Sequence, residues 1–489
     1  MQEDLSVVLA SNRGPISFVK TETGFETKGA AGGASPALDA VARRLGDRAF
    51  WVAAAISDAD REAVESGAAA EAAEELGYGF RYLTFAPDVY DGYYNEVSNR
   101  MLWYANHCLW DEVAVGAADL SPDAWEQSYE PVNKEFAHEI RAHLSPGALV
   151  LFQDYHLTTA PGHLRHDVPD ALIAHFTHSS FCGREGMAQL PPEIRRGVVE
   201  GLLGADLLGF HVGPWVEGFF GVCEDAGAIV HRELGAVDHE GRRTWVRAYP
   251  IPIDAKDLDQ RSQSPTVADW ARRFRNWAGE RRLIVRGDRA EPSKNIVRGF
   301  EAFALLLDRH PELASSVCFA ACVYPSRQGL KEYRDYTERI RAAADRVTAD
   351  HPGVIELYMS DDFDRTLGAY REYDVLLVNP LMDGMNLVAK EGPAVNERQG
   401  VLVLSRGAGS FAELGSSAVS IEDPLDVSET AEALWTAINL SEKERGRRAR
   451  DLAEIARSSK PSDWIEAQID DLAAIGRGER PLSEPASVG

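Results

Sequence analysis

Residues 375–391 have the sequence VLLVNPLMDGMNLVAKE, in which a short apolar run leads through a polar turn into a helical pattern. The apolar residues 375–378 predict a strand buried on both faces, and residues 387–396 predict the helix that follows it. A buried strand joined to a helix in this way is the repeating unit of a parallel α/β sheet. We therefore expect the rest of the chain to repeat this unit.

The same alternation of apolar runs and amphipathic segments extends over most of the chain. It predicts two series of strands, at residues 6–10, 50–56, 81–85, 149–153, 172–177 and 207–211, and at residues 283–286, 317–323, 354–359, 375–378 and 401–404. The helices expected between them include residues 35–45, 124–144, 193–203, 296–310, 330–350 and 387–396. The predicted fold class is α/β, with two Rossmann-like, doubly wound halves that bind ligands beyond the carboxyl ends of their strands.

A proline-containing stretch at residues 249–254 predicts the boundary between the halves. We expect an N-terminal domain over residues 1–252 and a C-terminal domain over residues 253–460, facing a central cleft. A last helix over residues 461–476 is expected to pack back on the N-terminal domain, and the polar tail 477–489 is expected to fray.

The chain has 489 residues and is strongly acidic, with 51 Lys and Arg against 77 Asp and Glu and a formal net charge of −26. Binding to a phosphate backbone needs basic patches, so this balance argues against a nucleic-acid binder and against docking on anionic lipid. An anionic ligand must be held by a local cluster of Arg and Lys within a repelling overall field.

Five cysteines are spread along the chain, at Cys108, Cys182, Cys223, Cys318 and Cys322. Their odd number and wide spacing predict neither a disulfide framework nor a zinc site. No leader pattern and no apolar run of membrane-spanning length is visible in the sequence, so we expect a cytoplasmic protein that does not enter a membrane.

Three polar side chains, Arg13, Asp154 and His178, each follow a predicted strand of the first half. Taken singly, they could be a surface ion pair, a cap and a core histidine. Three of them in one half favour a functional site, because the carboxyl ends of parallel strands meet at one edge. The aromatic stretch 93–103 could stack on a sugar, although such a stripe more often packs in a core.

Two segments have the composition of phosphate-binding turns. Residues 29–33, GAAGG, precede a predicted helix, where glycines let the backbone approach a ligand and the first helical N–H groups attract a phosphate. Arg289 and Lys294 follow the first strand of the second half and can neutralise a diphosphate. The alternative is a solvated helix cap in which Lys294 pairs with Glu291.

Residues 383–391 contain several groups that could hold a nucleotide sugar. Gly384 permits a tight turn, and the free N–H groups of residues 385–388 can bond sugar hydroxyls or phosphate oxygens. Glu391 lies about one turn into the helix and can accept both hydroxyls of a ribose. An Asp-capped helix without a ligand is the structural alternative, but the many polar groups after a buried strand favour a binding loop.

Taken together, these segments closely resemble the retaining sugar-nucleotide glycosyltransferases of family 20, the trehalose-6-phosphate synthase family, which have the GT-B fold. The resemblance extends from about residue 7 to the final helix. It is carried by Ser11-Asn12-Arg13, Gly32-Gly33, Tyr93-Tyr94-Asn95, Ser98-Asn99, Leu102-Trp103, Asp154-Tyr155-His156-Leu157, Asp206-Leu207-Leu208-Gly209-Phe210, Arg289 with Ser293-Lys294, Ser326-Arg327 and Asp383 through Glu391.

The resemblance implies an enzyme that makes trehalose 6-phosphate from UDP-glucose or GDP-glucose and glucose 6-phosphate. The acceptor-binding residues that it implies are Arg13, Tyr94, Trp103, Asp154 and Arg327. The donor-binding residues that it implies are Gly32, Gly33, Arg289, Lys294, Phe363, Asp383, Gly384, Met385, Asn386, Leu387, Val388 and Glu391. The residues that it places in the chemical step are Asp154, His178, Arg289 and Lys294.

The resemblance also implies a reaction without metal or other cofactor, in which Arg289 and Lys294 stabilise the leaving diphosphate. The leaving phosphate itself takes the acceptor proton. Asp154 then orients the acceptor more than it acts as a nucleophile. The partners implied are a nucleotide sugar and a phosphorylated sugar. The resemblance is also compatible with a homodimer or a homotetramer. The nucleotide of the donor stays undecided.

Three positions depart from the family pattern. A His-x-Pro-Phe-Pro run is replaced by HSSFCG at residues 178–183, a tryptophan is replaced by Ala54, and Pro252 replaces a glycine. Two alternatives therefore stay open. One is another phosphorylated acceptor, such as a glycerol or cyclitol phosphate, as in the pseudo-glycosyltransferase that makes validoxylamine 7′-phosphate. The other is a catalytically silent regulatory homologue. The intact residues 383–391 count against the pseudo-enzyme, and the retained cations count against a silent protein.

Overall fold

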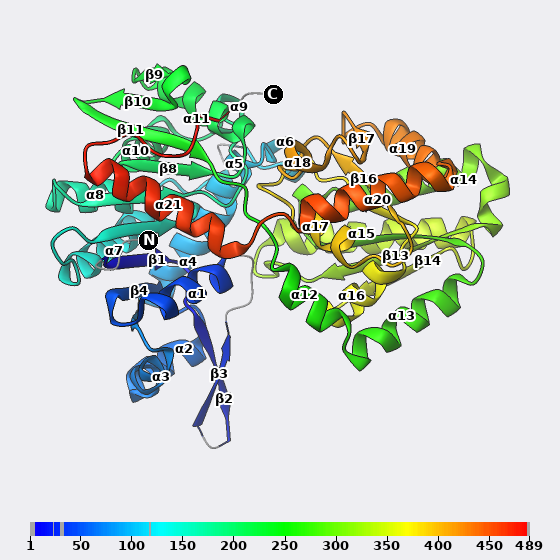
Figure 1. The fold of residues 1–489 in the computed structure, drawn as a ribbon, viewed down its shortest axis with the longest axis horizontal. Helices are drawn as coiled ribbons and strands as arrows, with labels where there is room; N and C mark the ends of the chain where they lie inside the picture. The colour runs from blue at the N-terminus through cyan, green and yellow to red at the C-terminus, as the bar shows by residue number, and fades with distance from the viewer. Residues whose placement is uncertain (1–4, 23, 30–33, 117–118, 487–489) are drawn as a thin grey trace. The chain divides into compact units, whose positions relative to one another are not determined.

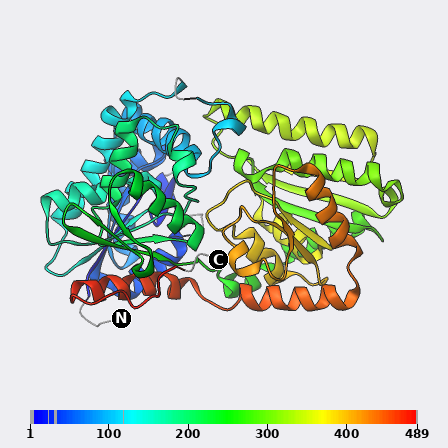
Figure 2. The same cartoon turned by 90° about the horizontal axis from the view of Figure 1, so that it is seen from above.

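The computed structural model describes residues 5–22, 24–29, 34–116 and 119–486. The chain divides into two compact units, the first made of residues 1–251 and 461–489 and the second of residues 252–460. Each unit contains a largely or wholly parallel sheet covered by helices (Figure 1 and Figure 2). The predicted α/β class is confirmed.

Within the described residues, the first unit is built on a nine-stranded sheet in the order β5-β4-β1-β6-β7-β8-β11-β10-β9. Its strands are β1 Val7–Ser11, β4 Ala49–Ala54, β5 Gly79–Leu83, β6 Leu149–Gln153, β7 Leu172–Phe176, β8 Leu207–Phe210, β9 Ile229–His231, β10 Ala236–His239 and β11 Arg242–Ala248. The strands from β5 to β11 are parallel, whereas β10 is antiparallel to β9 and β11. The chain builds outward from β1 in one direction and then from β6 in the other, so the switch point lies between β1 and β6.

The helices of the first unit are α1 Ser35–Leu45, α2 Asp58–Ser66, α3 Ala68–Leu76, α4 Pro87–Asp91, α5 Trp103–Asn106, α6 Trp110–Val113, α7 Glu130–Ala142, α8 Ala160–Asp167, α9 Arg184–Met187, α10 Pro192–Leu202, α11 Gly213–Asp225 and α21 Pro461–Gly476. A separate hairpin is formed by β2 Ile16–Thr21 and β3 Gly24–Gly29. The segments Gly92–Leu102 and Trp125–Tyr129 are π-helical. The helix predicted over 124–144 is therefore two segments, because the π-helical turn precedes α7. Helix α21, red in Figure 1, lies against α1 and the strands β6 to β8.

The second unit is built on six parallel strands in the order β14-β13-β12-β15-β16-β17, and the structure describes residues 252–460 throughout. The strands are β12 Arg282–Arg289, β13 Val317–Tyr324, β14 Ile355–Met359, β15 Val375–Val378, β16 Val401–Ser405 and β17 Val419–Ile421. The helices are α12 Ala255–Ser262, α13 Pro265–Ala278, α14 Ile296–Arg309, α15 Lys331–Asp350, α16 Phe363–Glu372, α17 Val388–Val395, α18 Phe411–Leu414, α19 Val427–Asn439 and α20 Glu442–Ala456. The strand order reverses between β12 and β15, which is the switch point of this sheet.

Apolar side chains on both faces of the second sheet explain why its strands are continuous apolar runs. Leu377 packs in a cluster with Phe300 and Phe319, whereas its neighbour Leu376 packs in a second cluster with Tyr373. Successive side chains of β15 thus point into different layers, as the two-residue period of a strand requires.

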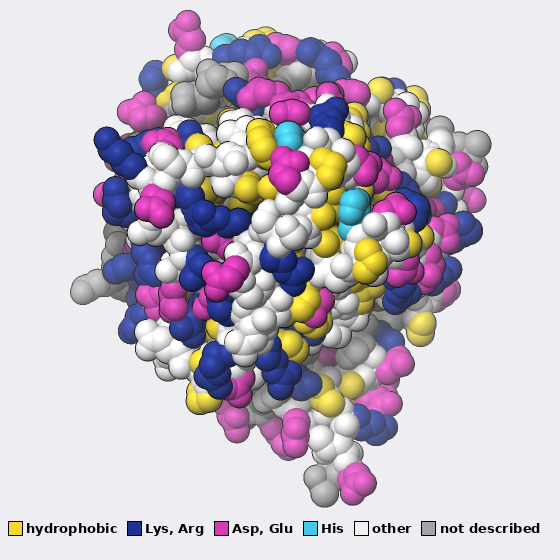
Figure 3. Space-filling model, turned by 90° about the vertical axis from the view of Figure 1, so that its right-hand side faces the viewer, with side chains coloured by type: hydrophobic (Ala, Val, Ile, Leu, Met, Phe, Trp, Pro, Cys, Tyr) yellow, Lys and Arg dark blue, Asp and Glu magenta, His cyan; other side chains and the backbone are white. Residues whose placement is uncertain are grey.

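Charged side chains of both signs are interspersed over the face shown in Figure 3, and hydrophobic side chains form only small groups there. Arg447 and Glu444 form an exposed ion pair with 2.8 Å between nitrogen and oxygen. Each exposed pair of this kind contributes at most about 1 kcal/mol to the free energy of unfolding. None of the helices in the described part of the chain is long and apolar enough to cross a membrane.

Candidate active site

The carboxyl ends of β1, β6 and β7 bring three predicted residues to one edge of the first sheet. The last residues of these neighbouring parallel strands are level with one another in the register. Arg13, Asp154 and His178 follow within two residues of the strand ends. They therefore lie at the switch point between β1 and β6, where doubly wound sheets bind ligands.

Asp154 and His178 are linked by a hydrogen bond from the backbone N–H of His178 to Asp154 Oδ1, 3.1 Å long. Asp154 has φ 73° and ψ 166°, a conformation that non-glycine residues rarely adopt and that is concentrated at functional sites. Burial, with help from the nearby His211, lowers the pKa of His178 well below 6.5, so its ring is neutral. Gln153 Oε1 lies 2.9 Å from His178 Nε2 and accepts its hydrogen, which leaves Nδ1 as the acceptor.

Aromatic rings form a wall beside this pair. Tyr94 stacks on Tyr90 and on His156, with ring centroids 5.6 Å apart in both pairs. Trp103 is largely buried and stacks on His107 at 3.9 Å. The stretch 93–103 therefore contributes both to the core and to the wall of the site. Stacked ring faces of this kind are suited to a sugar.

Arg13 is exposed beside this wall. Burial raises the pKa of Tyr90, and the nearby positive charge of Arg13 opposes that rise. The neighbouring Asn12 is buried and accepts a hydrogen bond from the Tyr90 hydroxyl at 3.2 Å. The edge of the first sheet thus combines one exposed guanidinium, a carboxylate and aromatic rings, a set that can bind a sugar phosphate.

The predicted cations of the second unit lie around a buried carboxylate. Glu291 is fully buried, accepts a hydrogen bond from Ser326 Oγ at 2.7 Å and lies 3.3 Å from Arg289 Nε. Burial alone would raise the pKa of Glu291, but Arg289, Arg327 and Lys294 outweigh it and lower this pKa to about 2. The alternative, a direct ion pair of Lys294 with Glu291, is not found among the described residues: Lys294 acts on Glu291 only as one nearby charge of this cluster.

Lys294 also forms an ion pair with Asp383, which accepts a further hydrogen bond from Asn386 Nδ2 at 2.9 Å. Asn386 has a φ of 64°, in the left-handed region. The turn after β12 and the loop after β15 are therefore fixed to each other across the switch point of the second sheet.

The loop after β15 leaves backbone donors available. Among the described residues, the N–H groups of Met385, Asn386, Leu387 and Val388 donate to no protein acceptor. Helix α17 begins at Val388, so these N–H groups precede or open the helix and favour an anion or a sugar hydroxyl.

Glu391 lies in the first turn of α17 and is partly exposed. Burial raises its pKa to about 7, and within the described chain no side chain pairs with its carboxylate. A carboxyl group without a protein partner beside open N–H groups is suited to accept ribose hydroxyls.

Two further predicted residues of the second unit follow β13 and β14, and of these Arg327 also acts on Glu291. Arg327 follows β13 in the second unit, and its Nη1 donates to the Tyr333 hydroxyl at 2.5 Å. Phe363 begins α16 after β14, and the Arg261 guanidinium lies 4.8 Å from its ring centroid. Gly32 and Gly33 lie outside the described residues. Sequence reasoning did not select His156, although it stands in the quoted run after β6, or Glu291 as an anchor.

The cysteine prediction is wrong. Cys108 and Cys182 form a disulfide, whereas Cys223, Cys318 and Cys322 are buried free thiols. The bonded pair is 74 residues apart in sequence, and only the packing of the loop after β7 on the end of α5 brings it together. Within the part of the chain that the structure describes, no group of three or more His, Cys, Asp or Glu side chains could hold a metal ion.

Two doubly wound units, each with a polar cluster at its switch point, are the architecture of the GT-B glycosyltransferases. The family model described as glycosyltransferase family 20 matches residues 5–474. The chain therefore belongs to glycosyltransferase family 20, and the predicted family and enzyme class are confirmed.

Curated relatives agree with this membership. A trehalose-6-phosphate synthase of Mycobacterium sp. (strain KMS) is 30% identical over 98% of both chains. A bifunctional trehalose-6-phosphate synthase/phosphatase of Thermoproteus tenax is 31% identical over 94% of this chain, which spans 62% of that protein. A validamine 7-phosphate valienyltransferase of Streptomyces hygroscopicus subsp. jinggangensis is 29% identical over 87% of this chain and 85% of its own length.

Solved structures show the same fold. An E. coli protein with bound UDP-2-fluoro glucose matches with a TM-score of 0.80 and 25% identity, over 96% of this chain and 99% of that chain. A UDP-forming alpha,alpha-trehalose-phosphate synthase of Burkholderia xenovorans in complex with glucose-6-phosphate matches with the same TM-score, identity and coverage.

Proposed function

We propose that the chain transfers glucose from a nucleotide-glucose to glucose 6-phosphate and so makes trehalose 6-phosphate with retention at the anomeric carbon. The observation that carries this proposal is the cluster of Arg289, Lys294 and Arg327 around buried Glu291, next to open backbone donors. It is supported by relatives named trehalose-6-phosphate synthase and by related structures bound to UDP-2-fluoro glucose and to glucose-6-phosphate.

The second unit would bind the donor. Arg289 and Lys294 would contact the diphosphate and stabilise the negative charge that grows on it as the glycosidic bond breaks. Donors held in place before the reaction are worth about 3–4 kcal/mol each in such a site. The ion pair with Asp383 would hold the Lys294 ammonium in position, and Glu391 would accept the ribose hydroxyls.

The first unit would bind the acceptor. Arg13 would neutralise the phosphate, and the rings of Tyr94 and Trp103 would contact the sugar. Asp154 would accept a hydrogen bond from another hydroxyl of the acceptor sugar and so orient the attacking hydroxyl, whose one proton passes to the leaving phosphate. His178, being neutral, would contact the donor sugar as a hydrogen-bonding group without changing its charge.

The test is to incubate the enzyme with UDP-, GDP- or ADP-glucose, with and without glucose 6-phosphate. We expect release of nucleoside diphosphate that depends on the acceptor, and a disaccharide phosphate identified by mass spectrometry and by the α,α configuration in NMR spectra. If glucose 6-phosphate gives no release above the acceptor-free background with any of the three donors, the proposal is wrong.

A second candidate keeps the fold and the donor but uses another phosphorylated acceptor. It is favoured by the validamine 7-phosphate valienyltransferase relative and by the sequence His178-Ser179-Ser180-Phe181-Cys182 at the edge of the acceptor region. A screen of glycerol, inositol and cyclitol phosphates with the best donor distinguishes the two, because the true acceptor will have the highest kcat/KM.

A further inference from the structure

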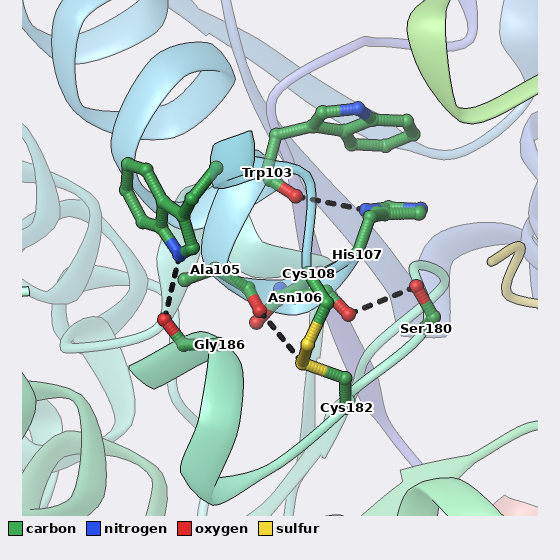
Figure 4. Close-up of a disulfide and its surroundings, with 9 residues drawn as sticks. Trp103, Ala105, Asn106, His107, Cys108, Ser180, Cys182 and Gly186 are labelled. Carbon is green, nitrogen blue, oxygen red and sulfur yellow. Dashed lines mark hydrogen bonds between the residues drawn. A yellow bond between two sulfur atoms is a disulfide. The ribbon is translucent and has the colours of Figure 1, made fainter. Parts of the chain in front are cut away.

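The disulfide between Cys108 and Cys182 joins two segments that both carry residues of the first-unit site (Figure 4). Cys108 comes two residues after α5, which begins at Trp103. Cys182 is near the end of the segment 178–183, which begins at His178 and follows β7. We call this segment the 178–183 loop. The bond is therefore five residues from Trp103 and four residues from His178 in the sequence.

Hydrogen bonds between the same two segments converge on one residue. The Asn106 carbonyl accepts from Ser180 Oγ at 3.0 Å and from the Cys182 N–H at 3.1 Å, and Asn106 Nδ2 donates to Ser179 Oγ at 2.9 Å. Because Cys108 has a φ of 49°, in the left-handed region, the turn after α5 has an uncommon conformation that needs support from its surroundings. The disulfide provides covalent support there.

The two bonded cysteines differ from the other three in accessibility. Cys108 and Cys182 are partly exposed, whereas Cys223, Cys318 and Cys322 are buried. A small dithiol can therefore reach the bond. It would transfer two electrons and two protons, so that the S–S bond breaks, both cysteines become thiols and the dithiol becomes a cyclic disulfide.

We propose that the Cys108–Cys182 disulfide is a redox-dependent positioning element, which holds the 178–183 loop and Trp103 in the arrangement that binds the phosphorylated acceptor. The proposal rests on the proposed function, because it assigns acceptor binding to the first unit. Reduction frees the loop and weakens acceptor binding, and leaves the contacts of the second unit with the nucleoside diphosphate unchanged.

The first experiment needs no activity. Protein purified without reductant is denatured and alkylated before and after treatment with dithiothreitol. We expect three reactive thiols before treatment and five after it, out of the five cysteines. Chymotrypsin should cleave the native reduced protein after Phe181 faster than the oxidised protein, because Phe181 is buried in the held loop. Five reactive thiols in protein exposed to oxidised glutathione, or equal cleavage rates, would overturn the proposal.

The second experiment measures KM for each substrate. Reduction of the wild type, or the double change Cys108→Ser and Cys182→Ser, should raise KM for the acceptor about tenfold and change KM for the nucleotide-glucose much less, because only His178 of the freed loop is assigned to the donor. Oxidised glutathione should restore the wild type but not the double variant. Cys223→Ala, which changes a buried free thiol of the same unit, should respond to dithiothreitol like the wild type. An equal response of the wild type and the double variant to dithiothreitol would contradict the proposal.

A wild type that accepts no glucose 6-phosphate would contradict the proposed function alone, since the thiol count and the cleavage rates would still decide the role of the disulfide.

Discussion

Lys294 and Asp383 form an ion pair across the point where the strand order of the second sheet reverses. Lys294 comes from the turn after β12 and Asp383 from the loop after β15, 89 residues further along the chain. Both side chains are about nine-tenths buried. The pair therefore holds an ammonium group in place before any ligand binds, as electrostatic catalysis requires.

Replacing Lys294 by Met should lower kcat by about 10²- to 10³-fold, because a positioned donor to the leaving diphosphate is lost. The variant should also be less stable, because the largely buried carboxyl group of Asp383 loses its ion-pair partner. Lys331→Met is the matched control, since Lys331 forms an exposed pair with Asp335. Steady-state rates and thermal unfolding of both variants test this. A similar loss of kcat in the two variants would refute the role of Lys294.

Replacing Arg289 by Ala should reduce kcat/KM for the donor by about 10²-fold, because one of the two cations assigned to the diphosphate disappears. Its side chain is about half exposed but pairs with the buried Glu291, so a modest loss of stability is expected as well, and thermal unfolding measures it. Arg447→Ala, which removes an exposed arginine paired with Glu444, should have wild-type rates. Release of nucleoside diphosphate measures both variants. Unchanged turnover of Arg289→Ala would remove the diphosphate role.

The pH dependence of donor binding should follow Glu391, whose pKa of about 7 is raised by burial. Ribose hydroxyls donate to the ionised carboxylate, so the nucleotide-glucose should bind about tenfold more tightly at pH 8 than at pH 6, with release of a proton on binding. Titration calorimetry in two buffers of different ionisation heat measures both quantities. Glu391→Gln should bind more weakly and with no such pH dependence, whereas the exposed Glu432→Gln should behave as the wild type. A pH-independent affinity of the wild type would contradict this assignment.

The raised pKa of Glu391 also makes the free energy of unfolding depend on pH. The folded chain holds this proton more tightly than the unfolded chain, whose Glu391 titrates near 4.5. This group therefore lowers the free energy of unfolding as the pH rises from 4.5 to about 7, and Glu391→Gln should remove that loss. Denaturant titrations of both proteins at several pH values measure it. A Gln variant with the same pH slope as the wild type would show that another group causes it.

The rate should show no ionisation of His178 near neutral pH, because burial lowers the pKa of this histidine well below 6.5. His178→Gln should lower kcat about tenfold, the worth of one hydrogen bond, without changing the shape of the pH–rate curve. His138→Gln, a change at an exposed histidine, is the control. An inflection between pH 6 and pH 8 that His178→Gln abolishes would show that the ring is charged in the resting enzyme.

Continuous apolar runs made several strands predictable. The predicted strands 149–153 and 375–378 coincide with β6 and β15, because strands buried on both faces carry no polar interruption. Strand β11, which lies between β8 and β10, was not predicted, since arginines at positions 242, 243 and 247 break its apolar pattern. The π-helical segment Gly92–Leu102 was also missed, because its hydrogen bonding depends on packing that a sequence pattern does not report.

The candidate site was partly predictable for a related reason. Polar residues directly after buried strands, such as Asp154 and Arg289, must lie at the edge where the strands end. The anchoring role of Glu291 was missed because it depends on complete burial among cations from two separate segments, the end of β12 with its following turn and the segment after β13. The disulfide was missed because nothing in the spacing of Cys108 and Cys182 indicates that their segments pack together.

Glu291 also determines how the site responds to the surrounding electrolyte. It is fully buried and ionised among Arg289, Arg327 and Lys294, so it serves these cations as a counterion that is covalently part of the chain. Dissolved salt screens exposed charges over about 10 Å or less, but it cannot exchange with a carboxylate bonded into the protein. We therefore expect concentrated salt to weaken this cluster less than it weakens exposed ion pairs, with an arriving diphosphate competing mainly with this tethered anion.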